Sequence, residues 1–124
     1  MSNNINIIVV DDDPDIGSMM KMMLEFKGYN VTLVSRVDKI TELLSAGSYQ
    51  LLILDMLIAG DSGNDLCRAL KADERFCTIP ILMFSAMPNG GEAAFESGAD
   101  DFIAKPFDMH TMLEKVSTLT KTAA

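Results

Sequence analysis

The sequence predicts a single α/β domain in which five parallel strands alternate with helices. Short apolar runs alternate along the chain with amphipathic stretches, which is the pattern of repeated strand–helix units. The runs are continuous in hydrophobicity, as strands are when helices cover both faces of their sheet. The length of 124 residues is that of one domain, and 48% of the residues are hydrophobic. We therefore expect one sheet with helices on both faces, formed by the whole chain.

The first strand is expected at residues 7–10, and the first helix follows it. Asp13 can cap this helix, and Pro14 suits its first turn. A stripe of methionines that includes Met19 recurs at helical spacing, and we interpret these side chains as part of the core. Gly28 is expected to end the helix. The remaining strands are expected at residues 31–34, 51–54, 81–84 and 102–104.

Four further helices connect and follow these strands. The second helix is expected around residues 40–44, and the third begins after Ser62, whose hydroxyl can cap it. Residues 88–91 have the composition of a turn, which leaves residues 92–97 for the fourth helix. The last helix begins with Asp108 as its cap.

Charge and composition exclude several classes of protein. The chain has 10 Lys and Arg against 18 Asp and Glu, and its net charge of −8 argues against direct binding to nucleic acid or to an anionic membrane. It has neither an apolar run long enough to cross a membrane nor a signal segment, so we expect a cytoplasmic protein. Cys67 and Cys77 form no metal-binding motif, and we expect free thiols.

Polar side chains follow four of the predicted strands. Asp11 and Asp12 follow the first strand, Asp55 the third, Ser85 the fourth and Lys105 the fifth. Because the carboxyl ends of parallel strands meet at one edge of a sheet, we expect these side chains to lie together. Neighbouring carboxylates repel one another unless a cation relieves them, and Mg²⁺ prefers oxygen ligands. The sequence therefore predicts a magnesium site here, with one carboxylate left to act as a nucleophile.

A calcium loop is the alternative for the acidic residues near the start of the chain. Asp11, Asp13 and Asp15 have the spacing with which such a loop begins. The glycine of the motif comes one position late, at Gly17, and Met22 stands where a glutamate is needed. The calcium-loop motif does not fit.

Four segments, taken in order, resemble the receiver domain of two-component response regulators. They are IIVVDDDPDI at 7–16, LLILDMLIAGDSG at 51–63, ILMFSA at 81–86 and GADDFIAKPFD at 98–108. The resemblance covers essentially the whole chain. It implies a flavodoxin-like, doubly wound sheet with the strand order 2-1-3-4-5. It also implies one receiver domain over residues 1–124, with no effector domain in the chain.

The resemblance assigns a role to each polar residue of the edge. Asp55 is expected to be the phosphoacceptor, and Lys105 to pair with the phosphoryl oxygens. Mg²⁺ is expected to bind Asp12, Asp55 and the backbone carbonyl of Leu57 directly. Asp11 is expected to contact the ion through a water molecule.

Two further residues correspond to the conformational switch of the family. Ser85 matches the hydroxyl that turns inward to the phosphoryl group, and Phe102 matches the aromatic residue whose ring follows it. Phe102 has no tyrosine hydroxyl and cannot make the polar contact of one. The resemblance also suggests a cis peptide bond between Lys105 and Pro106.

The sequence departs from the family pattern in three places. Ala59 stands where relatives have proline. The segment from Ser85 to Gly98 is shorter than usual, so the downstream partner of this chain cannot be inferred from the partners of relatives. Leu57 and Met87 are apolar where relatives that lose phosphate quickly have polar residues. We expect them to hinder attack by water and to slow self-dephosphorylation.

The expected function is a signalling switch with magnesium-dependent self-phosphorylation and self-dephosphorylation, and not an enzyme acting on external substrates. The phosphoryl donor would be a sensor histidine kinase or a phosphotransfer protein, and the output a contact with a downstream protein. The chain would be a monomer or a phosphorylation-linked dimer.

Three other classes of protein are alternatives to a phosphorylated receiver. A receiver-fold interaction module that acts without phosphorylation stays open. A phosphatase of the haloacid dehalogenase type needs an acidic residue at the position of Leu57. A flavin-binding protein needs a phosphate-binding loop after the first strand, where this chain has three aspartates.

Overall fold

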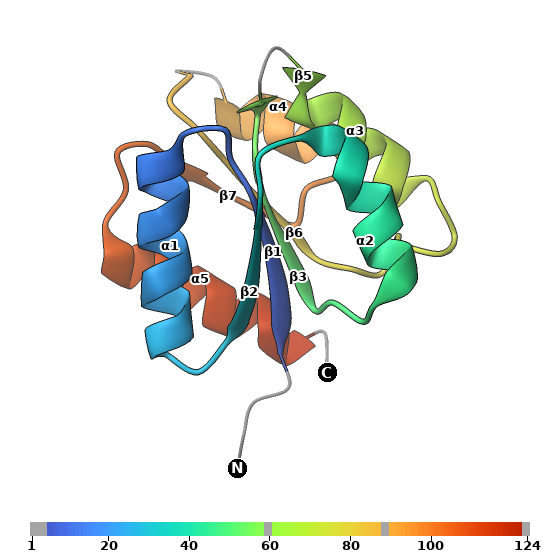
Figure 1. The fold of residues 1–124 in the computed structure, drawn as a ribbon. Coiled ribbons are helices and arrows are strands. Elements are labelled where there is room, and N and C mark those ends of the chain that lie inside the picture. Colours follow the sequence, from blue (N-terminus) through green and yellow to red (C-terminus); the bar gives the residue numbers. More distant parts are fainter. Residues whose placement is uncertain (1–4, 59–60, 88–89, 123–124) are drawn as a thin grey trace.

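A five-stranded parallel sheet forms the middle of three layers (Figure 1). The computed structural model describes residues 5–58, 61–87 and 90–122. Across the sheet the strands are β2 (Asn30–Val34), β1 (Asn6–Val10), β3 (Leu51–Asp55), β6 (Ile81–Ser85) and β7 (Asp101–Ala104). Since β6 and β7 are the fourth and fifth of the predicted strands, the strand order 2-1-3-4-5 is confirmed.

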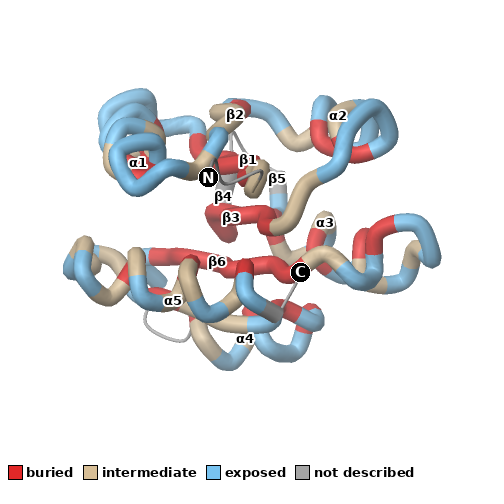
Figure 2. The backbone as a smooth tube through the Cα atoms, turned by 90° about the horizontal axis from the view of Figure 1, so that it is seen from below, coloured by how far each residue is buried: buried red, intermediate tan, exposed pale blue. Residues whose placement is uncertain are grey.

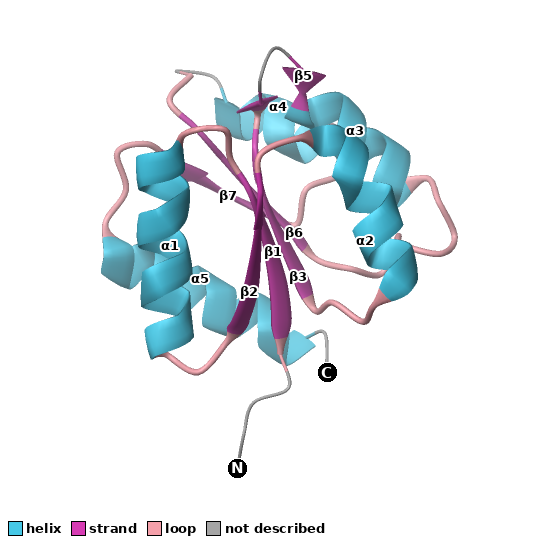
Figure 3. Ribbon diagram, viewed as in Figure 1, coloured by secondary structure: helices cyan, strands magenta, loops and turns pink. Residues whose placement is uncertain are grey.

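Helices cover both faces of the sheet, as the continuous apolar strands predict (Figure 3). One face carries α1 (Pro14–Phe26) and α5 (Met109–Thr122), and the other carries α2 (Ile40–Ala46), α3 (Gly63–Lys71) and α4 (Gly90–Glu96). Side chains from alternate strand positions fill two separate cores, one under each helix layer. Figure 2 shows the central strands largely buried and the outer sides of the helices exposed.

The predicted helix ends are confirmed by their hydrogen bonds. Asp13 caps α1, its carboxylate accepting from the backbone N–H groups of Asp15 at 2.9 Å and Ile16 at 3.3 Å. Ser62 caps α3 in the same way. Gly28, just after α1, has a φ of 96°, which glycine adopts at little cost.

The methionine stripe of α1 is only partly core, so that prediction is partly wrong. Met20 is fully buried, but the side chain of Met19 is 39% exposed. The helix instead turns Gly17 toward the sheet, where an added Cβ would lie 2.8 Å from the Leu33 side chain. The close approach at Gly17 fixes the rotation of the helix, and that rotation turns Met19 outward.

Three local features were missed or shifted in the prediction. A short antiparallel ribbon of β4 (Leu57–Ile58) and β5 (Asp61–Ser62) follows β3, and a 3₁₀ turn, η1 (Val37–Lys39), precedes α2. The fourth helix starts at Gly90, two residues before the predicted start. Ala59, Pro88 and Asn89 lie outside the described residues.

Other expectations are borne out. Both cysteines are free, with Cys67 buried and Cys77 exposed, and the Lys105–Pro106 bond is cis. In the part of the chain that the structure describes, no helix combines the length and the apolar character that a membrane span requires.

Candidate phosphoryl-acceptor site

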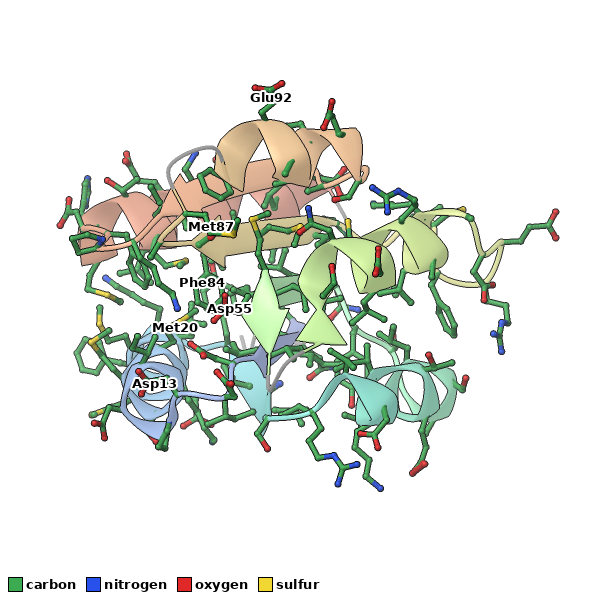
Figure 4. All side chains as sticks on the ribbon, turned by 90° about the horizontal axis from the view of Figure 1, so that it is seen from above. Asp13, Met20, Asp55, Phe84, Met87 and Glu92 are labelled. Atoms are coloured by element: carbon green, nitrogen blue, oxygen red, sulfur yellow. The ribbon has the colours of Figure 1, made fainter. Side chains whose placement is uncertain are left out.

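The carboxyl edge of the sheet gathers the predicted polar residues around one buried carboxylate. Asp55 is the last residue of β3 and is buried, Asp11 follows β1, and Lys105 follows β7. Figure 4 looks down on this edge and shows Asp55 near its centre, between Asp13 on the side of α1 and Met87 on the side of α4. The parallel sheet therefore brings together residues that are far apart in the sequence.

Lys105 joins the carboxylates of the edge. Its Nζ lies 3.1 Å from Oδ2 of Asp55, to which it donates a hydrogen bond, and 3.8 Å from Oδ2 of Asp11. The same ammonium lies 4.6 Å from the centre of the Phe84 ring, whose face attracts a cation. The ammonium group is thus held beside Asp55 by charge from two sides and by an aromatic ring.

Asp11 is a buried carboxylate with only one of its two oxygens hydrogen-bonded among the described residues. Its Oδ1 accepts a hydrogen bond from the backbone N–H of Asp13 at 2.9 Å. Its Oδ2 is buried and accepts no hydrogen bond from any residue that the structure describes. Burial raises the pKa of Asp11 to about 6, and the negative charge of Asp55 adds to this, whereas the Asp13 N–H and Lys105 oppose it.

The acidic residues form a cluster with the dimensions of a cation site. One carboxylate oxygen from each of Asp11, Asp12 and Asp55 lies within 4.8 Å of the others, and Asp12 is exposed. An oxygen-only donor set of this kind suits Mg²⁺. The unsatisfied Oδ2 of Asp11 points to the same conclusion, since a bound cation or its water would supply its missing partner.

The two predicted switch residues lie on β6 and β7, the two strands that follow β3 across the sheet. Ser85 ends β6 and is buried, and its Oγ accepts a hydrogen bond from the backbone N–H of Met87 at 2.9 Å. The Ser85 carbonyl accepts from the backbone N–H of Lys105 at 2.9 Å, which links the ends of β6 and β7. Phe102, on β7, is half-buried against the core beneath α2 to α4, while Met87 is exposed.

Two positions complete the loop that follows Asp55. Leu57 begins β4, where it pairs with Ser62. Gly63, to which sequence reasoning assigned no role, begins α3, and a Cβ there would overlap the backbone carbonyl oxygen of Asp55. Its N–H donates to the carbonyl of Met56 at 2.8 Å. A glycine at the end of the segment 51–63 was the available signal for this close approach.

Comparison with known proteins agrees with this geometry. The family model of the response regulator receiver domain matches residues 7–117. The chain belongs to this family. A receiver domain is a signalling switch in two-component systems, and receiver domains generally bind Mg²⁺ at an acidic pocket.

Individual curated relatives are similar to this chain over about half of their own length. The DNA-binding dual master transcriptional regulator RpaA of Synechocystis sp. is 37% identical over 119 residues, which are 93% of this chain and 48% of that protein. The chain spans about half the length of the curated relatives it matches.

Solved receiver structures superpose closely on this chain. The signal receiver domain of a histidine kinase from Syntrophus aciditrophicus has a TM-score of 0.87 and 31% identity, over 94% of this chain and 90% of that one. The beryllofluoride-activated receiver domain of Klebsiella pneumoniae RstA has a TM-score of 0.83 and 25% identity, over 93% and 97% of the two chains.

Proposed function

We propose that this receiver accepts a phosphoryl group on Asp55 from the phosphohistidine of a kinase or phosphotransfer protein. The observation that carries the proposal is the buried Asp55 carboxylate, with Lys105 3.1 Å away and the unsatisfied Asp11 beside it. A carboxylate held at a strand end between fixed charges is preorganised to act as a nucleophile.

In the proposed step, an oxygen of the Asp55 carboxylate attacks phosphorus as the phosphorus–nitrogen bond of the donor breaks. The bonding pair leaves with the imidazole nitrogen, and an acyl phosphate forms on Asp55. Lys105, already beside Oδ2 of Asp55, stabilises the negative charge of the arriving phosphoryl oxygens. In dephosphorylation, water attacks phosphorus as the bond between phosphorus and the Asp55 oxygen breaks, which releases inorganic phosphate and returns the free carboxylate.

The proposed Mg²⁺ site consists of the carboxylates of Asp11, Asp12 and Asp55 and the backbone carbonyl of Leu57. When bound, the ion supplies positive charge that offsets repulsion between the carboxylates and the phosphoryl group. Asp11 is proposed to act through water, a role that gives its Oδ2 a partner.

Phosphorylation is proposed to act on protein contacts by shifting the balance between two conformations. The Ser85 hydroxyl turns to the phosphoryl group, and the Phe102 ring moves with it, which alters the surface around α4. We propose that residues 1–124 form one receiver unit whose output is a contact with a downstream protein, as a monomer or a phosphorylation-linked dimer. Its net charge of −8 disfavours a direct contact with nucleic acid.

Intact mass spectrometry after incubation with acetyl phosphate tests this function. We expect one added phosphoryl group that requires both Mg²⁺ and Asp55, so that Asp55→Asn protein gains no mass. The matched control is Asp65→Asn, which changes an exposed carboxylate of α3 outside the cluster and leaves phosphorylation intact. If no adduct forms, and beryllofluoride with Mg²⁺ leaves the amide NMR spectrum unchanged, the interaction module that acts without phosphate replaces this proposal.

The lifetime of the acyl phosphate is proposed to depend on Leu57 and Met87. Replacing them together by Asn and Glu places polar groups where they can orient water for attack, so decay becomes faster. The loss of phosphoryl mass after removal of acetyl phosphate measures the rate. An unchanged decay rate would show that the two apolar residues do not protect the acyl phosphate.

A further inference from the structure

The first turn of α4 rests directly on both residues of the proposed switch. A Cβ at Gly90 would lie 3.0 Å from Cζ of Phe102 and 3.2 Å from Cβ of Ser85. A Cβ at Gly91 would lie 3.2 Å from Cδ2 of the same ring. Carbon atoms prefer separations of about 3.5–4.0 Å, so only glycine allows the helix to come this close.

Hydrogen bonds connect the same turn to the Ser85 hydroxyl. The backbone N–H of Met87 donates to Oγ of Ser85 at 2.9 Å, and the N–H of Gly90 donates to the carbonyl of Met87 at 3.1 Å. Two successive hydrogen bonds therefore lead from the serine hydroxyl to the first residue of α4. A rotation of that hydroxyl toward Asp55 changes the first of these bonds.

The Phe102 ring depends on packing for its position. Phenylalanine has no hydroxyl with which to fix the ring by a hydrogen bond. The ring is half-buried, and Gly90 and Gly91 lie in van der Waals reach of it at the start of α4. Gly90 differs from Gly91 because it also faces the Ser85 side chain.

We propose that Gly90 is a positioning residue of the switch, which couples Ser85 to the Phe102 ring and to α4 because it has no side chain. The inference rests on the proposed function, in which Ser85 turns toward a phosphoryl group on Asp55. When Ser85 turns, the start of α4 follows through Met87, and the ring repacks against the bare backbone of Gly90. A methyl group at position 90 lies between the ring and Ser85 and breaks this coupling.

NMR of Gly90→Ala protein, with beryllofluoride and Mg²⁺ as the phosphoryl mimic, tests the inference. Carbon-13-labelled phenylalanine gives one ring signal for Phe102, assigned by its loss in Phe102→Leu protein. In the wild type, beryllofluoride is expected to shift the Asp55 amide, the Phe102 ring signal and the α4 amides together. In Gly90→Ala protein the ring signal is expected to be displaced without beryllofluoride, and beryllofluoride then shifts the Asp55 amide but neither the ring nor α4.

Two further variants separate coupling from a general effect on the helix. Glu92→Ala changes an exposed residue of the same helix and is expected to keep the full response. Gly90→Ala combined with Phe102→Leu removes the ring atom that the new methyl group meets, and the response of the α4 amides is expected to return. Alanine favours helix more than glycine does, so the single variant is expected to fold, with its other amide signals unchanged.

The outcomes distinguish this inference from the function on which it rests. A normal Asp55 response, together with a wild-type ring and α4 response in Gly90→Ala protein, would overturn the role of Gly90 alone. Failure of α4 to recover in the double variant would overturn the part that the Phe102 ring has in this coupling, because only the contact of position 90 with Ser85 remains there. No response of the wild-type Asp55 amide would overturn the proposed function and this inference with it.

Discussion

Two lysine–carboxylate pairs stand at opposite edges of the sheet and differ in what else they contact. Lys105 lies 3.1 Å from Asp55 at the carboxyl edge, and Lys71 lies 2.7 Å from Asp100 at the amino edge. Both lysine side chains are mostly buried, at 18% and 19% exposure.

At the amino edge, backbone groups satisfy the remaining hydrogen bonds of the pair formed by Lys71 and Asp100. Lys71 also donates to the carbonyls of Ile79 at 2.9 Å and Cys77 at 3.4 Å. Oδ2 of Asp100 also accepts from the backbone N–H of Ile81 at 2.8 Å. This pair ties the end of α3 to the chain that enters β6 and β7, which is a structural role.

The pair at the carboxyl edge is surrounded by charge that is not fully satisfied. Next to Asp55 lies Asp11, whose buried Oδ2 accepts no hydrogen bond from the described residues. A buried group without its partners lowers stability, and such groups are retained where they bind or react. Satisfaction of the neighbouring groups therefore distinguishes the two pairs, although their lysines are equally buried.

The largest expected effect is on how stability depends on pH. Burial raises the pKa of Asp11 from 3.8 to about 6, and the charge of Asp55 adds to this while Lys105 opposes it, so the folded state holds the Asp11 proton more tightly than the unfolded state does. Its contribution therefore falls as pH rises from about 4 to about 7, by an amount on the order of 3 kcal/mol. Urea unfolding without Mg²⁺ should show Asp11→Asn gaining stability relative to the wild type over this range. A constant difference between the two proteins would contradict the assignment.

The second expected effect is on the affinity for Mg²⁺. Asp11→Asn is expected to weaken Mg²⁺ binding by about 10- to 100-fold, the usual effect of losing a group that acts through a bound water. Titration of the amide NMR signals with Mg²⁺ measures this. Asp100→Asn, at the other edge, is the matched control and should bind Mg²⁺ as the wild type does.

A smaller effect on stability is expected when the Asp100 carboxylate is removed from its pair with Lys71. Asp100→Ala leaves the buried N–H of Ile81 without its acceptor and Lys71 without its carboxylate. The expected cost is about 1–2 kcal/mol in the free energy of unfolding. Urea unfolding measures it, and phosphorylation by acetyl phosphate should be preserved in the folded variant. A loss of phosphorylation would mean that the two edges are not independent.

The smallest effect is expected at an exposed pair. Lys21 and Glu25 on α1 are only 2.6 Å apart, but both side chains are well exposed to water. Lys21→Ala is expected to change the free energy of unfolding by no more than about 0.5 kcal/mol. Thermal unfolding of this variant beside Asp100→Ala would compare the two pairs. A larger loss in Lys21→Ala would show that distance predicts the strength of these pairs better than their surroundings do.

The sequence predicted the strands and the polar side chains that meet at the carboxyl edge of the sheet, because both follow from general properties of parallel sheets. A continuous apolar run reads as a buried strand, and Asp55 and Lys105 meet because parallel strands end together. The ribbon of β4 and β5 was not predicted, since two residues in each strand give no periodic signal.

Other details depend on contacts that no local pattern reveals. Gly90 and Gly91 have the composition of a turn, but they begin α4, and the Phe102 ring occupies the space that side chains at these positions would fill. The outward position of Met19 follows from the approach of Gly17 to Leu33. The missing partner of Asp11 Oδ2 is likewise a property of the folded chain alone.

The hydrogen bond between Lys105 and Asp55 joins residues 50 positions apart, and Asp11 is more distant still from Lys105 along the chain. The entropy of closing so long a loop makes contacts of this sequence separation slow to form. A fragment that ends before β7 lacks Lys105 and therefore the pair that it forms with Asp55. Under the proposed function, uptake of a phosphoryl group would therefore also report that the chain has completed its fold.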